Sequence, residues 1–170
     1  MIKYLNAVVT FSEIPDEISL CINITNCRHN CFNCHSPELQ RDIGIYLTRD
    51  VLYKLVELNK GITCICFMGY GRNPRDIERR AKWIRKKYPE LKIAIYSGDE
   101  HIANCWDIAN WDYIKVGPYI DSLGGLDSPK TNQRLYKINH NGNFIEDITI
   151  KFWKQFKQIT KNEDTSKETK

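Results

Sequence analysis

The sequence predicts an α/β protein: a small, incomplete (βα) barrel with a largely parallel sheet, followed by a C-terminal β-hairpin and a helix. Three observations lead to this fold class. Apolar runs of strand length alternate with segments of helical periodicity between residues 18 and 116. Most of the helical segments have capping or breaking residues at their ends. Near the C-terminus, an Asn-Gly pair separates two further strand-like runs.

Four strands are expected in the first two thirds of the chain, over residues 18–24, 62–68, 91–96 and 113–116. The first alternates apolar residues with polar or small ones, whereas the second is a continuous apolar run, typical of a strand buried on both faces. Because helices separate these strands, they should pair in parallel through right-handed crossovers.

Helices are expected over residues 48–58 and 74–88, with a short one over residues 100–108. Thr48 is a typical N-cap residue, and Gly61 follows the end of the first helix. Pro74 suits the first turn of the second helix, and Pro89 ends it. Trp106 and Trp111 flank the short helix and are expected to anchor packing.

The remaining chain is expected to hold a long loop, a hairpin and a last helix. Residues 121–129 are rich in Gly, Ser and Asp; residues 135–138 and 144–148 form the hairpin around Asn141-Gly142; and residues 150–159 form the helix. One domain spans residues 1–157, and the charged residues 158–170 are expected to be a disordered tail.

Composition narrows the class of protein. A chain of 170 residues can bury a core without disulfides, and its seven cysteines are an odd number. Residues 1–20 do not resemble a secretory signal, and no apolar run has the length of a membrane span. We therefore expect reduced thiols, a cytoplasmic location and no membrane association. The net charge of +4 is too modest to indicate a nucleic-acid partner.

Three closely spaced cysteines, Cys27, Cys31 and Cys34, form a CxxxCxxC loop directly after the first expected strand. A structural zinc site needs four ligands, and a bacterial ferredoxin motif needs a fourth cysteine followed by proline. Three thiolates without a fourth favour a 4Fe-4S cluster with one iron open to a small molecule. Zinc stays an alternative, because His29 or His35 could complete a Cys3His shell.

Four loops should meet at one edge of the sheet, because the carboxyl ends of parallel strands lie together. They are the cysteine loop and the turns Gly69-Tyr70-Gly71, Ser97-Gly98-Asp99 and Gly117-Pro118-Tyr119. A ligand on the open iron would therefore meet glycine-rich backbone from several strands.

From these residues the chain resembles the radical S-adenosylmethionine superfamily and, within it, the activating enzymes of anaerobic (class III) ribonucleotide reductases. The resemblance covers about residues 4 to 150. It rests on residues 13–20, 26–39, 63–69, 96–98 and 116–119 and on the block from Thr131 to Tyr136, which contains Asn132-Gln133-Arg134. The cysteine loop indicates the superfamily, and the Asn-Gln-Arg block favours the narrower family.

The resemblance implies an oxidoreductase that uses a 4Fe-4S cluster to cleave S-adenosylmethionine reductively. The resulting 5′-deoxyadenosyl radical takes a hydrogen atom from a glycine of the large reductase subunit and leaves a glycyl radical there. A flavodoxin or ferredoxin-type protein would supply the electron. The resemblance also suits an activase of another glycyl radical enzyme, of the formate-lyase type, and a non-enzymatic zinc module is the third alternative.

Roles follow from the matching positions. Cys27, Cys31 and Cys34 would ligate iron, and the backbone around Asn33, Cys34 and His35 would face the adenine. The turn Gly69-Tyr70-Gly71 would receive the methionine amine, and Ser97 would reach the ribose or carboxylate, unless it only bonds its own turn. No residue beyond the cluster ligands is expected to be catalytic.

The second turn departs from the family pattern of two glycines followed by an acid, because Gly71 stands where the acid is expected. A lost charge-assisted hydrogen bond costs about 1.5 to 3 kcal/mol, so we expect weaker cofactor binding than in relatives. Asp99, on the next strand's turn, is a candidate substitute. The electron donor, the oligomeric state, the glycyl radical partner and the role of Asn132-Gln133-Arg134 do not follow from the sequence.

Overall fold

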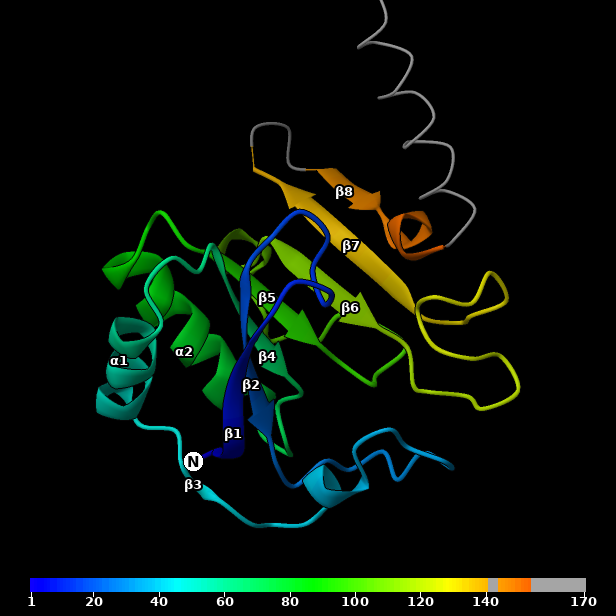
Figure 1. Cartoon of the computed structure of the whole chain (residues 1–170), viewed down its shortest axis with the longest axis horizontal. Helices are drawn as coiled ribbons and strands as arrows, with labels where there is room; N and C mark the ends of the chain where they lie inside the picture. The colour runs from blue at the N-terminus through cyan, green and yellow to red at the C-terminus, as the bar shows by residue number, and fades with distance from the viewer. Residues whose placement is uncertain (141–143, 154–170) are drawn as a thin grey trace, which may run out of the picture.

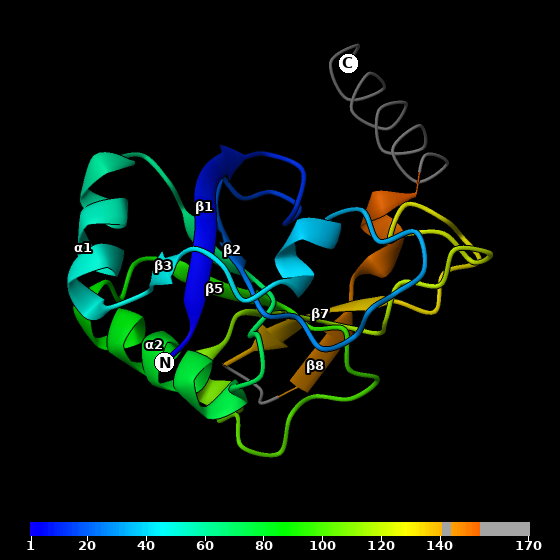
Figure 2. The same cartoon turned by 90° about the horizontal axis from the view of Figure 1, so that it is seen from below.

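The computed structural model describes residues 1–140 and 144–153, with no side-chain placement for Phe144. Within these residues, eight strands form one sheet in the order β3-β1-β2-β4-β5-β6-β7-β8, and two helices pack on one of its faces (Figures 1 and 2). The strands are β1 (Lys3–Thr10), β2 (Ser19–Ile24), β3 (Ile45–Tyr46), β4 (Cys64–Met68), β5 (Lys92–Tyr96), β6 (Tyr113–Val116), β7 (Arg134–Asn139) and β8 (Phe144–Asp147). The helices are α1 (Arg49–Leu58) and α2 (Pro74–Lys87).

The α/β class is confirmed, but the expectation of a largely parallel sheet is wrong for the sheet as a whole. Strands β2, β4, β5 and β6 pair in parallel, as predicted. The other four of the seven pairings are antiparallel. The sheet is open, with β3 and β8 at its two edges, and is not a clear parallel (βα) barrel. Antiparallel strands need only short connections, so β1 and β7 extend the sheet without crossover helices.

Local sequence signals place both α-helices. The Thr48 hydroxyl accepts a hydrogen bond from the Val51 amide at 3.2 Å, and the Asn73 side chain accepts one from the Asp76 amide at 3.0 Å. The first contact is the expected N-cap, and the second is the N-cap of the helix whose first turn contains Pro74. The buried stripes of α1 and α2 pack on the apolar residues of β4 and β5, so the main core lies between the helices and the sheet.

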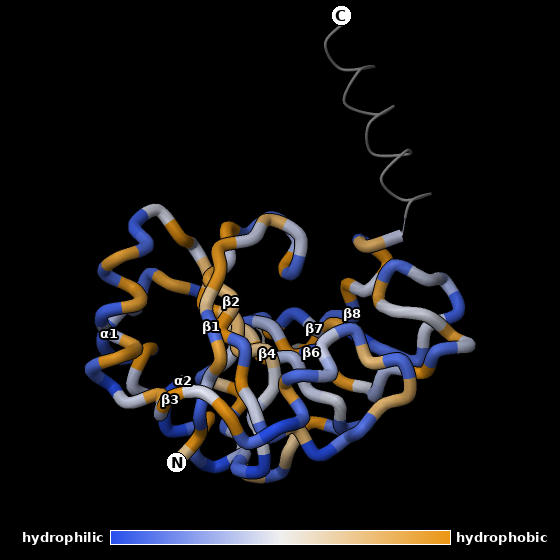
Figure 3. Tube along the Cα trace, turned by 60° about the horizontal axis from the view of Figure 1, so that its bottom comes forward, coloured by the Kyte–Doolittle hydropathy of each residue, from blue (hydrophilic) through white to orange (hydrophobic). Residues whose placement is uncertain are grey.

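A second, smaller core lies on the opposite face of the sheet. Cys21, Cys64 and Cys66 are buried there and are covered by Ile14 and Ile148 from the flanking loops. Cys64 and Cys66 are thus small core residues. Figure 3 shows the apolar residues concentrated on the strands, while much of the connecting loops is hydrophilic.

The prediction of a short helix over residues 100–108 is wrong. That segment is irregular and ends in a single 3-10 turn, Ile108–Asn110. Two tryptophans fasten it to α2: Trp106 Nε1 donates to the Pro74 carbonyl at 2.9 Å, and Trp111 Nε1 donates to Glu78 at 2.8 Å. Both tryptophans are buried packing anchors, as predicted, and their tertiary contacts replace helical ones.

The C-terminal hairpin is confirmed by the antiparallel pairing of β7 with β8. Its turn, residues 141–143, lies outside the described residues. A 3-10 turn, Thr149–Phe152, stands at the start of the expected last helix. The rest of that helix and the expected disordered tail also lie outside the described residues. Within residues 1–140 and 144–153, neither helix has the length and hydrophobicity that crossing a bilayer would require.

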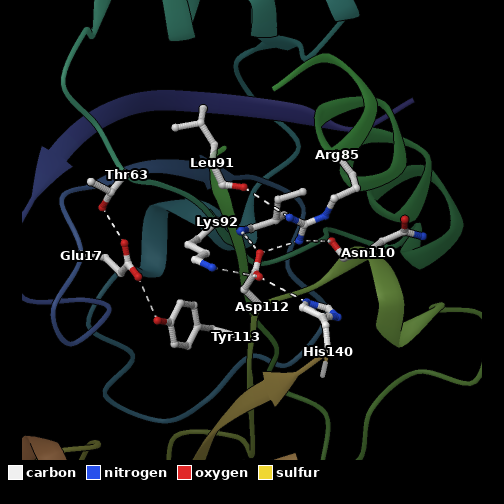
Figure 4. A network of polar contacts seen from close by, with 10 residues as sticks. Glu17, Thr63, Arg85, Leu91, Lys92, Asn110, Asp112, Tyr113 and His140 are labelled. Atoms are coloured by element: carbon white, nitrogen blue, oxygen red, sulfur yellow. Dashed lines mark hydrogen bonds and ion pairs between the residues drawn. The ribbon is translucent and has the colours of Figure 1, made fainter. Parts of the chain in front are cut away.

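A buried carboxylate secures the edge at which the parallel strands begin (Figure 4). Asp112 accepts a hydrogen bond from the Ile93 amide at 2.8 Å and pairs with Arg85 of α2. Lys92 and His140 lie 3.8 Å and 3.3 Å from it. Asp112 therefore joins α2, β5 and the end of β7. Arg85 therefore has a structural role.

Candidate functional site

The cysteine loop, residues 25–44, leaves the carboxyl end of β2 and lies at the edge where the parallel strands end (Figure 1). Hydrogen bonds close its base. The Thr25 hydroxyl donates to the Ile43 carbonyl at 2.7 Å, and the amides of Asn26 and Cys27 donate to the carbonyls of Arg41 and Leu39, both at 2.9 Å. The backbone thus returns on itself and presents the segment between residues 27 and 38 as a compact loop.

Three free, half-buried thiols occupy this loop: Cys27, Cys31 and Cys34. The Cys34 amide donates to the Cys31 carbonyl at 3.2 Å, which places these two cysteines on one turn. Burial raises the pKa of Cys27, and the neighbouring Cys31 and Cys34 raise it further. The three sulfurs are therefore close enough to interact electrostatically. Across the described part of the chain, no three His, Cys, Asp or Glu side chains already converge as a metal site does.

Asparagine sets the shape of the loop. Asn26, Asn30 and Asn33 have φ values of 63°, 45° and 52°, in the left-handed region. Asparagine tolerates this region better than other residues with a side chain. Asn33 and His35 both have exposed side chains. His35 lies close enough to Glu13 to act on that carboxyl electrostatically and lower its pKa, although burial dominates and raises it.

A buried lysine lies close to the thiols. Lys115, on β6, donates to the carbonyls of Gly117 at 2.6 Å and Ser97 at 3.3 Å. Burial lowers the pKa of Lys115 to about 8, while Cys31 and Cys27 act in the opposite direction. An ammonium in this position offsets negative charge on the thiolates. Sequence reasoning missed Lys115, because a lysine within a short strand carries no signal of its environment.

The turn after β4 excludes a side chain at its third position. Gly69 and Gly71 have φ values of 97° and 61°, which favour glycine. A Cβ added at Gly71 would lie 2.8 Å from the carbonyl oxygen of Thr25, at the base of the cysteine loop. An acid at position 71 would thus require the backbone to move. The close approach of the two loops therefore leaves no room for a side chain at position 71.

Asp99 is the point at which the cysteine loop and the two turns meet. Its carboxylate accepts hydrogen bonds from the Tyr70 hydroxyl and from Arg28 Nη2, the latter at 2.7 Å. His29 Nε2 lies 3.4 Å from the same carboxylate without forming a well-oriented hydrogen bond. The Arg28 guanidinium also lies over the Tyr70 ring, 5.7 Å from its centroid. Nothing in the sequence marked Arg28 as a partner of Asp99.

Tyr70 and Gly98 pack beneath the contacts of Asp99. Tyr70 is buried, and its ring packs edge-on against Trp106 with 5.7 Å between centroids. Burial and the carboxylate of Asp99 together raise the pKa of Tyr70, so the phenol stays protonated and donates. The His29 ring lies against Gly98, where an added Cβ would come within 2.6 Å of it. A side chain at position 98 would therefore displace the His29 ring.

Ser97 also lies at the edge where the parallel strands end, which we call the rim. Its hydroxyl forms a hydrogen bond within its own turn. Ser97 is buried, and its Oγ accepts a hydrogen bond from the Asp99 amide at 3.0 Å. This is the turn role that the sequence left open as an alternative. Desolvation raises the pKa of Asp99, yet the hydrogen bonds and charges of Tyr70, Arg28 and His29 outweigh it and lower the pKa overall. Asp99 is therefore ionised at neutral pH.

The Asn132-Gln133-Arg134 block braces the loop that follows β6. Asn132 Nδ2 donates to the Pro118 carbonyl at 2.9 Å, and Arg134 Nη1 donates to the carbonyls of Thr131 and Gln133, both at 2.7 Å. The side-chain oxygen of Asn132, Oδ1, is buried and has no hydrogen-bond partner in the described part of the molecule. These contacts give the block a structural role in shaping the rim.

The rim therefore combines three free thiols, a buried ammonium and a partly exposed carboxylate on loops that pack against one another. Tyr70, Gly71, Ser97 and Asp99 lie together with Arg28 and His29, whereas the side chains of Asn33 and His35 are turned to solvent. Thiols of this kind can hold a soft metal or an iron–sulfur cluster. Comparison of the chain with protein-family models, with curated proteins and with solved structures found no match.

Proposed function

We propose that this chain is a radical S-adenosylmethionine enzyme that generates a glycyl radical on an anaerobic ribonucleotide reductase. The observation that carries the proposal is the free CxxxCxxC triad on the loop after the first parallel strand. Thiolates are the ligands of iron–sulfur clusters, and three of them leave one iron of a 4Fe-4S cluster without a protein ligand. The triad, the rim of turns and the resemblance of residues 116–119 and 131–136 support the same conclusion.

The donor set fits the cluster chemically. Cys27, Cys31 and Cys34 are unpaired by disulfides and close enough to influence one another. The bound cluster would supply the electron that cleaves S-adenosylmethionine. The protein's own residues would bind and orient: Lys115 offsets negative charge near the thiolates, and the turns at residues 69–71 and 97–99 present backbone and the Asp99 carboxylate. Because metal binding orders its ligands, we expect the three thiols to converge when the cluster assembles.

The partners belong to the proposal as well. The substrate protein would be the large reductase subunit with its glycine loop, and the electron donor a flavodoxin or ferredoxin-type protein. The cytoplasmic location follows from the same assignment. An activase of a formate-lyase-type enzyme would share the cluster and the cofactor but act on a different glycyl radical protein.

Anaerobic reconstitution tests the function. We expect about four irons and four sulfides per chain and, under reduction, conversion of S-adenosylmethionine to methionine and 5′-deoxyadenosine. Cys31→Ser should lose the intact cluster, whereas the matched core variant Cys66→Ser should keep it and lose only stability. An organic-radical electron paramagnetic resonance signal on an anaerobic reductase would identify the partner. Stoichiometric zinc without cleavage would overturn the proposal, and a signal only on a formate-lyase-type protein would redirect it.

A further inference from the structure

We propose that Asp99 is the carboxylate that receives the α-ammonium group of S-adenosylmethionine, in place of an acid on the preceding turn. This inference rests on the proposed function. The methionine end of the ligand carries an ammonium group, and a buried or half-buried ammonium needs a carboxylate or carbonyl partner. The chain must supply that partner at the rim beside the cysteine loop.

The turn after β4 cannot supply it from position 71. Gly71 has a left-handed backbone, and a Cβ there would lie 2.8 Å from the Thr25 carbonyl oxygen. The neighbouring turn stands at the same level, because Met68 of β4 pairs with Tyr96 of β5. Gly71 is the third residue after Met68, and Asp99 is the third after Tyr96. Asp99 thus occupies the equivalent position one strand further along the sheet.

The backbone holds Asp99 in place. Its amide donates to Ser97 Oγ at 3.0 Å, and its carbonyl accepts from the Gly117 amide at 2.6 Å. The Tyr70 hydroxyl, from the turn that lacks the acid, donates to Oδ2. The carboxylate is therefore directed at the turn where the family pattern places its own acid.

The other carboxylate oxygen of Asp99, Oδ1, already forms an ion pair with Arg28. Arg28 Nη2 lies 2.7 Å from Oδ1, and the side chains of Arg28 and Asp99 are 52% and 22% exposed. An exposed arginine on a surface loop can leave at little cost in free energy. We infer that Arg28 and the ligand's ammonium compete for Asp99. Removing the carboxylate and removing the arginine should therefore have different effects on affinity.

The test measures binding to the anaerobically reconstituted protein by equilibrium dialysis, with two ligands and two variants. S-Adenosylmethionine has the ammonium group, whereas 5′-methylthioadenosine keeps the adenosine, has an uncharged thioether in place of the sulfonium, and lacks the chain that carries the ammonium and carboxylate groups. For Asp99→Asn we expect about 10- to 100-fold weaker binding of S-adenosylmethionine, the range of a charge-assisted hydrogen bond, with no change for 5′-methylthioadenosine. Arg28→Met should bind S-adenosylmethionine at least as tightly as the unaltered protein.

Three results would overturn the inference: unchanged S-adenosylmethionine affinity in Asp99→Asn, equal weakening of both ligands in that variant, or matching losses in Asp99→Asn and Arg28→Met. The second and third would mean that Asp99 only anchors the cysteine loop. Iron and sulfide content, measured for each variant, shows that the cluster is equally loaded. If the unaltered protein loads the cluster but binds neither ligand, the proposed function itself fails, and the result differs from all three.

Discussion

Asp112 and Asp99 are two carboxylates at opposite ends of the parallel strands, and they differ in burial and in hydrogen-bond partners. The Asp112 side chain is 6% exposed and accepts from the Ile93 amide and from Arg85, which α2 holds in place. The Asp99 side chain is 22% exposed, and its cationic partner, Arg28, comes from the cysteine loop. Both have cationic neighbours, but only Asp112 is bonded to the backbone of a central strand.

The difference separates a structural carboxylate from an exchangeable one. A buried acid with a backbone donor and a fixed arginine cannot lose a partner without leaving unpaired groups in the core. A partly exposed acid whose arginine is half in water can exchange that arginine for a ligand. The edge where the parallel strands begin is thus built for stability, and the edge where they end is suited to binding.

The largest effect is expected for Asp112→Ala. It leaves the Ile93 amide and Arg85 without their acceptor, so the free energy of unfolding should fall by about 3 to 5 kcal/mol. Urea unfolding followed by circular dichroism measures it. The matched variant at the other end of the strands, Asp99→Ala, should cost less, about 1 to 2 kcal/mol, because it removes an exposed ion pair and the acceptor of the buried Tyr70 hydroxyl. Equal losses at the two positions would remove the distinction between the edges.

Lys115 should make the free energy of unfolding depend on pH. Its pKa is lowered from 10.5 to about 8 by burial, so between these values the unfolded chain binds more protons than the folded protein. The lysine's contribution to stability therefore rises with pH through this window. In the metal-free protein, the stability difference between the unaltered chain and Lys115→Met should shift by about 3 kcal/mol in favour of the unaltered chain.

That shift is read from unfolding curves at several pH values, with groups common to both proteins cancelling in the difference. Lys115→Arg keeps a charge that does not titrate in this range, and it should lack the rise as well. A difference that stays constant across the window would mean that Lys115 is well hydrated, and that this edge has no buried cation.

The two glycines on either side of β4, Gly61 and Gly71, allow the two ends of the parallel strands to be compared at the level of the backbone. Gly61→Ala, before the strand, places Ala at a φ of 89° in open space and should cost about 1 kcal/mol. Gly71→Ala, after the strand, adds a contact of 2.8 Å with the Thr25 carbonyl and should cost about 2 to 3 kcal/mol. Thermal unfolding of both variants measures the difference. Equal costs would mean that position 71 has room for an acid.

The smallest effect is expected for Arg28→Met in the metal-free protein. Arg28 is half exposed, so its ion pair with Asp99 should contribute less than about 1 kcal/mol to stability. A double-mutant cycle with Asp99→Asn isolates the pair's contribution from other effects of each change. A coupling energy as large as the loss in Asp112→Ala would show that the arginine is fixed and would argue against its exchange for a ligand.

Local signals in the sequence were enough to locate most elements. The strands β2, β4, β5 and β6 and the caps at Thr48 and Asn73 were predictable because hydrophobic periodicity and capping depend on neighbours in the chain. β1 and β3 were missed. The segment before Trp111 was wrongly predicted to be a helix. Its conformation is fixed by hydrogen bonds to α2, and such contacts between distant parts of the chain leave no local pattern in the sequence.

The sequence by itself determined that three thiols lie together on a loop after a strand, because their spacing of four and three residues allows nothing distant to intervene. Only the tertiary structure decided the rest of the rim. Strand register sets Asp99 beside Tyr70, the approach of the cysteine loop excludes a side chain at Gly71, and burial lowers the pKa of Lys115. These properties arise between residues far apart in the chain, where spacing along the sequence gives no information about distance.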